Sequence, residues 1–135
     1  MQLLIKDAAV CTNPVPAGLA INGDSNLQLL TAAIENSEVI AIDFPQFVDG
    51  RGYSQARLLR EQYRFQGELR ATGNVLYDQL YFMSRCGFNS FLLNEEEVAR
   101  VGGLVVLLEA FAEISLGYQP ALDSTPVLSQ LRRSI

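Results

Sequence analysis

The chain has 135 residues, of which 49% are hydrophobic and 19% are charged, and its formal net charge is −5. This length and balance predict a single folded domain over residues 1–135, because a complete eight-stranded α/β barrel needs roughly 250 residues. The acidic balance argues against non-specific nucleic-acid binding, and the absence of histidine with only two cysteines excludes a histidine-based triad and a four-cysteine metal site built by one chain.

Strand signals recur along the chain at intervals that leave room for a helix between them. The continuous apolar run at residues 39–42 is typical of a strand that is covered on both faces. Shorter runs predict further strands at residues 19–22, 68–72, 88–93 and 114–118. Residues 1–16, which contain Pro14 and Pro16, are expected to form a short N-terminal arm or hairpin.

Helix signals fall between these strands, and each begins with a residue type that caps helices. The helix starts are expected at Asp24 or Ser25, at Ser54, at Asn74 and at Asn94. The second helix is expected to end before residue 67, and the third at Gly87, in the usual place of a C-terminal glycine. Glu97 has capping-box spacing for the fourth helix. Gly102 and Gly103 inside this helix predict close helix–sheet packing, with a functional kink as the alternative.

The alternation of strands and helices predicts an α/β fold with a largely parallel sheet of about five strands and right-handed crossovers. The sequence leaves open whether this sheet is open or forms a truncated barrel. Because ligands bind beyond the carboxyl ends of strands in open parallel sheets, polar residues after each strand are candidate site residues. Asp43 and Asp78 are the candidates for handling protons at such a site.

The specific chemistry of the chain is concentrated in residues 43–91, which hold six of the nine arginines and ten of the twelve aromatic residues. Two glycines between a strand and a helix let the backbone approach a ligand, and the arginine between them suits an oxyanion. The candidate anion-binding residues are Asp49, Gly50, Arg51, Gly52, Tyr53 and Ser54, with Arg70, Gly73 and Asn74. A glycine turn with a surface contact between Asp49 and Arg51 is the alternative interpretation.

A basic stripe is expected along the second helix, where Arg57, Arg60 and Arg64 follow helical spacing. One explanation is a solvated helix face. The other is a docking face for an acidic partner, to which Arg85 would add a further contact.

Arg70 is unusual because it lies in the middle of an expected strand. A buried guanidinium group needs a partner. An edge strand would leave the group in solvent. Otherwise Asp43 or Asp78 is expected to pair with it.

The cellular location is predicted from the cysteines and the apolar runs. Cys11 and Cys86 make no disulfide framework, which favours a reducing cytoplasm. The apolar start at residues 1–5 is too short for a secretion signal, and the apolar run at residues 101–108 is too short to span a membrane. We therefore expect a cytoplasmic protein without a membrane segment.

These motifs resemble a bacterial family, domain of unknown function 934, whose members are labelled probable oxidoreductases of sulfite reduction. The resemblance covers about residues 39–121 and rests on residues 43–45, 49–54, 56–60, 67–71, 73, 78–80, 85–88 and 118–121. The family pattern has Lys in place of Gln46, Thr in place of Val48, and Asp in place of Asn74 and Asn89. Because members are typically encoded beside the sulfite reductase haemoprotein, the resemblance implies a role in sulfite reduction within sulfur assimilation.

We expect an accessory protein of assimilatory sulfite reduction that docks on the sulfite reductase haemoprotein, or on its electron donor, through the arginine-rich face. The first alternative is a small oxidoreductase that binds a flavin or a sulfur oxyanion, held by Arg51 and Arg70, with Asp43 or Asp78 handling protons. The second alternative is a dimeric scaffold without catalysis, because five strands leave open sheet edges. The sequence shows no evident cofactor motif or metal site, and whether the protein is an enzyme stays open.

Overall fold

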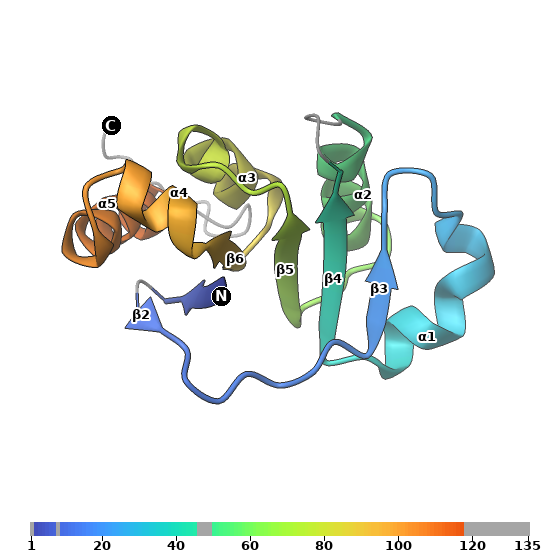
Figure 1. Cartoon of the computed structure of the whole chain (residues 1–135). Coiled ribbons are helices and arrows are strands. Elements are labelled where there is room, and N and C mark those ends of the chain that lie inside the picture. Colours follow the sequence, from blue (N-terminus) through green and yellow to red (C-terminus); the bar gives the residue numbers. More distant parts are fainter. Residues whose placement is uncertain (1, 8, 46–49, 118–135) are drawn as a thin grey trace.

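The computed structural model describes residues 2–7, 9–45 and 50–117, with side chains described as far as residue 112. Its strands form one open sheet in the order β2-β1-β6-β5-β4-β3 (Figure 1). Strands β3 to β6 run parallel, and β1 lies antiparallel to both of its neighbours. The strands are β1 Gln2–Lys6, β2 Ala9–Val10, β3 Leu19–Ile21, β4 Val39–Phe44, β5 Glu68–Gly73 and β6 Ser90–Asn94. The predicted α/β fold with a largely parallel sheet is thus confirmed.

The helices pack on one face of this sheet. Strands β3 to β6 are neighbours in chain order, and right-handed crossovers in one direction place their connecting helices on the same side. Alternate strand residues such as Ile40 and Ile42 therefore form the core with Ala56 and Leu59 of the following helix. The helical elements are η1 Leu27–Leu30, α1 Thr31–Asn36, α2 Gly50–Glu61, η2 Tyr77–Gln79, α3 Leu80–Cys86, α4 Glu95–Arg100 and α5 Leu104–Gly117.

The hairpin expected near the N-terminus is present, whereas the strand expected near residue 114 is not. The arm at residues 1–16 contains the hairpin β1–β2, and β1 enters the sheet beside β6. The closing strand expected at residues 114–118 is wrong, because residues 114–117 belong to α5 and residue 118 lies outside the described residues. The strand beside β6 is therefore the N-terminal β1.

The break between α4 and α5 has a backbone cause. Gly102 and Gly103 have backbone φ angles of +109° and +108°. L-residues that carry a side chain rarely adopt such angles. A Cβ atom added to Gly103 would meet nothing within 4 Å. The expected close packing against the sheet is therefore wrong, and the glycines instead end one helix and start another.

Several helix starts also move from their expected positions. The cap of η1 is Asn26, whose Oδ1 accepts a hydrogen bond of 3.0 Å from the Gln28 N–H, rather than Asp24 or Ser25. Helix α2 begins at Gly50, so Ser54 lies inside the helix. The shift in η1 arises because neighbouring polar residues have similar capping ability.

Of the helix starts expected at Asn74 and Asn94, only the second is confirmed. Leu76 precedes η2, so Asn74 is not its N-cap. Asn94 precedes α4 as expected, but it makes no capping bond there and its Oδ1 accepts from the Gln2 side chain at 3.1 Å. Gly87 does end α3 in the left-handed conformation, as predicted.

The face of the sheet opposite this core carries a buried ionic cluster centred on Glu68. Its Oε2 accepts hydrogen bonds from Arg70 Nε at 3.0 Å and from the Ser90 hydroxyl at 2.7 Å. Its Oε1 lies 3.0 Å from Lys6 Nζ. Arg70 also donates from Nη2 to the Val15 carbonyl at 2.8 Å. This cluster ties three adjacent strands and the linker before β3 together.

The position of Arg70 corrects an expectation. Strand β5 is internal, between β6 and β4, so Arg70 is not on an edge strand. Its ionic partner is Glu68, two residues earlier on the same face of the same strand, rather than Asp43 or Asp78. A buried charge pair within one strand is possible here because residues i and i+2 share a face.

Glu68→Gln is expected to destabilise the fold by about 3 kcal/mol, because it leaves Arg70 buried without its counter-charge. Burial raises the pKa of Glu68, but hydrogen bonds from Ser90, Lys6 and Arg70 outweigh it and hold the pKa below 4.5. The stabilisation is thus present above pH 4.5 and is lost as the pH falls through the lowered pKa. Urea denaturation at a series of pH values measures both effects.

The matched control for this prediction is Glu61→Gln, at the exposed end of α2. It should change the free energy of unfolding by no more than about 0.5 kcal/mol. Equal effects of the two substitutions would contradict the role assigned to the cluster.

Candidate functional site

The carboxyl ends of β4 and β5 bring together part of the expected ligand site. Asp43 is exposed and lies opposite Thr72 in the parallel ladder, and its Oδ1 accepts from the Thr72 hydroxyl at 3.3 Å. Gly73 has a φ of +85°, and a Cβ atom there would lie 2.1 Å from the Phe44 carbonyl oxygen. The Asn74 N–H donates to that carbonyl at 2.8 Å. Close backbone packing therefore explains this glycine.

Asp78 belongs to a different environment from Asp43. It is exposed in η2, and its charge contributes to raising the pKa of Arg100, whose chief partner is Glu97. Glu97 accepts from the Tyr77 N–H at 2.8 Å and from Arg100 Nη2 at 2.6 Å. The bond with Arg100 holds the pKa of Glu97 below its usual value, against the effect of burial.

The predicted anion loop is the first part of α2. Arg51 forms an ion pair with Asp24, and both side chains are exposed, so the pair contributes little to stability. Gly52 is buried against the Phe44 ring, and a Cβ atom there would lie 2.6 Å from Cε2. Asp49 lies outside the described residues. Gly50 and Ser54 are exposed in the helix. The candidate residues 50–54 therefore belong to a helix rather than to a loop.

The arginines of the expected stripe do not share one exposed face. Arg60 is half-buried, and its guanidinium group donates to three carbonyl oxygens, those of Phe65, Gly67 and Gly87, at 2.7–3.0 Å. Arg57 is exposed in α2, and Arg64 is exposed beyond the end of that helix, with a φ of +58°. Arg60 thus secures the turns after α2 and α3.

Aromatic side chains and arginines meet instead on the outer surface of α2 and α3. The Tyr53 ring lies edge-on to the Phe82 ring, with 4.8 Å between centroids, and packs against Phe44 on its other side at 5.2 Å. Arg85 lies 5.6 Å from the centroid of the Tyr81 ring and donates to its hydroxyl at 3.0 Å. Burial raises the pKa of Tyr53.

This surface exposes aromatic side chains. The Tyr81 and Phe82 side chains each remain 49% exposed. Arg57 follows Tyr53 by one helical turn and so lies on the same side of α2. We call this surface the aromatic patch, and its residues are Tyr53, Arg57, Tyr81, Phe82 and Arg85.

Residues 18–128 match a sequence model described as a bacterial protein of unknown function, DUF934. The chain belongs to this family. No curated protein matches the chain. The family match begins just before β3, so the hairpin β1–β2 lies outside the matched residues, whereas the aromatic patch lies within them.

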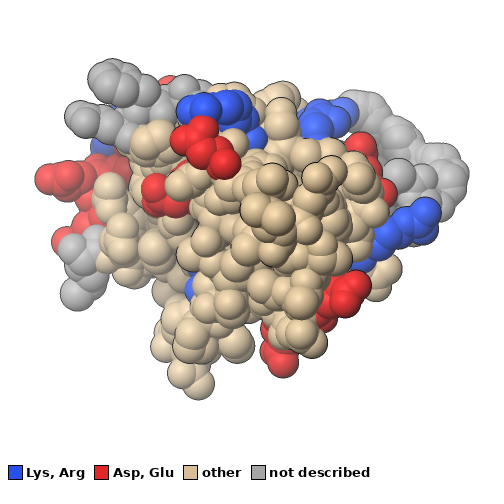
Figure 2. All heavy atoms as spheres, turned by 90° about the vertical axis from the view of Figure 1, so that its right-hand side faces the viewer, with Lys and Arg blue, Asp and Glu red and all other residues tan. Residues whose placement is uncertain are grey.

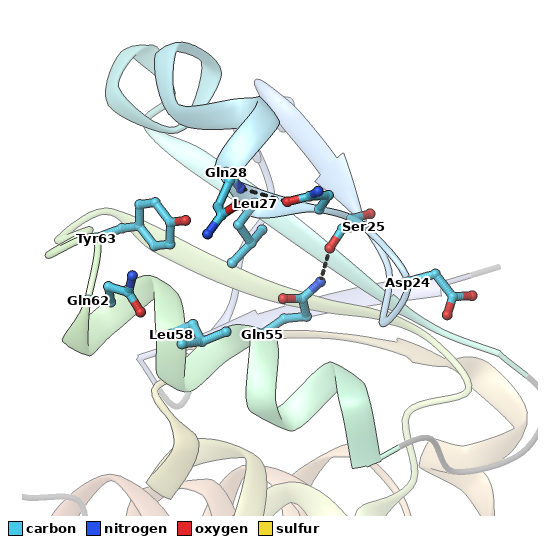
Figure 3. Close-up of a pocket in the computed structure, with 9 residues that line it drawn as sticks. Asp24, Ser25, Leu27, Gln28, Gln55, Leu58, Gln62 and Tyr63 are labelled. Atoms are coloured by element: carbon cyan, nitrogen blue, oxygen red, sulfur yellow. Dashed lines mark hydrogen bonds between the residues drawn. The ribbon is translucent and has the colours of Figure 1, made fainter.

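A groove between η1 and α2 was not anticipated from the sequence (Figure 3). It is an open hollow of about 480 Å³, lined mainly by amide and apolar side chains: Asp24, Ser25, Asn26, Leu27, Gln28, Gln55, Leu58, Gln62 and Tyr63. Buried Gln55 holds its two walls together by donating to the Asn22 carbonyl at 3.0 Å and the Ser25 carbonyl at 2.8 Å. The helical spacing of residues 55, 58 and 62 was the available signal.

The side of the molecule that carries α1 is largely uncharged. Figure 2 shows a broad area without charge there, with basic and acidic groups towards its margins. Leu29 is 81% exposed in η1, and Leu58 is 41% exposed in α2. This family member therefore has an aromatic, basic surface over α2 and α3, and a neutral surface on the α1 side.

In the part of the chain that the structure describes, no group of three Cys, Asp or Glu residues could hold a metal ion. None of its helices is long and apolar enough to cross a membrane. Cys86 is buried and Cys11 is half-buried, and both are free thiols.

Arg60→Ala is expected to destabilise the protein by about 2 kcal/mol, because three carbonyl oxygens lose a charged donor. Arg57→Ala, which removes an exposed arginine one turn earlier, should change stability by no more than about 0.5 kcal/mol. Chemical denaturation of both variants measures this difference. An equal, small effect would show that Arg60 is a surface residue after all.

Proposed function

We propose that this protein is an accessory protein that docks on an acidic partner through the aromatic patch. The observation that carries the proposal is the exposure of Tyr81 and Phe82, with Arg85 lying against the Tyr81 ring and Tyr53 against the Phe82 ring. Tyrosine, phenylalanine and arginine are enriched at the energetically important centres of protein interfaces. Aromatic rings that stay half exposed in a single chain are available to be covered by another protein.

The charge of the patch favours an acidic partner. Arg57 and Arg85 give it a positive charge, although the whole chain has a net charge of −5. Within the described residues, no ion pair engages either arginine. Complementary charge at an interface speeds association and selects the partner.

The aromatic patch is also firmly supported from beneath. Tyr53 lies between the buried Phe44 ring and Phe82, and Phe44 also packs on Phe88 at 5.6 Å between centroids. Rings held by the core lose little conformational entropy when a partner covers them. This pre-organisation favours docking over a role as ordinary exposed surface.

The partner that we propose is the sulfite reductase haemoprotein or its electron donor. This part of the proposal rests on the resemblance to proteins of sulfite reduction. The proposed place of the interaction is the cytoplasm. The proposed docking surface differs from the predicted stripe, because the Arg60 guanidinium group donates to backbone carbonyls and is not available to a partner. Tyr53, Tyr81 and Phe82 belong to the docking surface instead.

The alternative proposal is a small oxidoreductase with a flavin or a sulfur oxyanion at the strand ends. Exposed Asp43 beside Thr72 favours it as a proton-handling group. Arg51 and Arg70 have separate partners, Asp24 and Glu68, so an anion held by both would have to compete with two carboxylates. Sulfite binding that is lost in Arg51→Ala would support this alternative.

Phe82→Ala is expected to weaken docking at least about 30-fold, the effect of losing a central aromatic side chain worth about 2 kcal/mol. The measurement is isothermal titration calorimetry of the full chain against the purified haemoprotein and against its donor. Arg85→Glu should also weaken binding, and its effect should shrink at high salt.

Leu29→Ala is the matched control, because it removes a large exposed apolar side chain on the α1 side, outside the aromatic patch. Its affinity should stay within about twofold of the unsubstituted chain. The proposal fails if the unsubstituted chain binds neither protein, or if Phe82→Ala binds as tightly as Leu29→Ala.

A further inference from the structure

The hairpin β1–β2 pairs along the whole of β1 with the sheet, although the strand that follows it in the chain lies at the other edge. All five residues of β1 pair with β6, from Gln2 opposite Asn94 to Lys6 opposite Ser90. Leu4 and Ile5 are buried. Yet the next strand in the chain, β3, lies at the opposite edge of the sheet. Residues 11–18 must therefore cross the whole sheet, as the long blue segment in Figure 1 shows.

This linker has little length to spare. Five strand spacings separate β2 from β3, a distance of about 24 Å at roughly 4.8 Å per spacing. Nine residue steps lead from Val10 to Leu19 and span about 28 Å in the extended polyproline conformation, at roughly 3.1 Å per step. Pro14 and Pro16 restrict the backbone to this kind of conformation.

The linker is also held to the sheet at two points along this path. The Val15 carbonyl accepts from Arg70 at 2.8 Å, and the Gly18 N–H donates to the Val39 carbonyl at 2.9 Å. These bonds restrict the linker further. The hairpin thus reaches its place beside β6 through a short segment that contains two prolines and is bonded to the sheet on its way.

An element that makes many contacts but is tethered by a short connection can be exchanged between two copies of a chain. Exchange keeps every pairing of β1 with β6 and also keeps the Lys6–Glu68 bridge. In the exchanged arrangement, the linker connects the hairpin to the sheet of a second molecule. The opposing term is the entropy lost when two chains associate, so exchange should depend on concentration.

We propose that two copies of this protein exchange their N-terminal hairpins, so that β1 of each chain pairs with β6 of the other. The partner at the β6 edge is then a second copy of this chain. This inference is independent of the docking function, because it rests on the sheet and linker and not on the aromatic patch.

A cross-strand disulfide distinguishes the two arrangements. Gln2 and Asn94 lie opposite each other, with a side-chain hydrogen bond of 3.1 Å, so Gln2→Cys with Asn94→Cys places two thiols side by side. Cys11→Ser removes the more accessible native thiol. The full chain is unfolded, refolded at a series of concentrations, oxidised and separated without reductant. Gln2→Cys with Cys11→Ser, but without the second new cysteine, is the control.

The expected result is a covalent dimer whose fraction rises with the protein concentration during refolding. The control is expected to give no covalent dimer. Insertion of six Gly and Ser residues into the linker should lower the dimer fraction about tenfold, since it raises the chance that each hairpin finds its own β6. Deletion of residues 12–14 shortens the reach to about 19 Å, less than the width to be crossed, and should give mainly dimer.

A closed monomer at every refolding concentration would overturn the proposal. So would a closed monomer in the variant that lacks residues 12–14. If that variant does not fold, the concentration series and the insertion variant still decide the question, because both keep the hairpin and all of its contacts.

Discussion

The carboxylate of Glu68 occupies the point where three strands from different parts of the chain meet. Burying such a charge costs several kcal/mol unless donors surround it, and Arg70, Ser90 and Lys6 supply them from β5, β6 and β1. The cluster therefore fixes the register between β1 and β6. A slip of one residue would move Lys6 to the opposite face of the sheet and leave the carboxylate short of a donor.

This constraint divides the sheet into two chemically different faces. The ionic cluster and the linker occupy one face, and the helices pack on the other around Ile40, Ile42 and Leu69. Helices α2 and α3 are held side by side there. The series of rings from Phe44 through Tyr53 to Phe82 then connects the core to the surface. The surface proposed for docking is thus an outward continuation of the core.

The sequence was sufficient to predict the parallel strands of the sheet, but not the antiparallel strand β1 that pairs with β6. The apolar run at residues 39–42 and the alternation with helices led directly to β4 and its neighbours. Strand β1 was harder, because its pairing with β6 joins residues about ninety positions apart. The apolar run at residues 114–118 could not be assigned by periodicity alone, since a short run fits a buried helix as well as a strand.

The candidate site shows the same division between local and long-range information. Helical spacing placed Arg57 and Arg60 on neighbouring parts of α2, but it could not show that the turns at Gly67 and Gly87 would occupy the Arg60 guanidinium group. Nor could it show that Tyr53 and Phe82 meet, because that contact depends on how two helices pack. The concentration of arginines and aromatic residues in residues 43–91 was visible in the sequence, and the aromatic patch is built from residues of this region.

The most direct measurement is the rate of anaerobic sulfite reduction by the haemoprotein and its donor, with this protein added in increasing amounts. If the protein is an accessory subunit, the rate should rise and saturate near one copy per haemoprotein. Phe82→Ala should require much more protein for the same rise. A rate that is unchanged at every ratio would contradict the docking function.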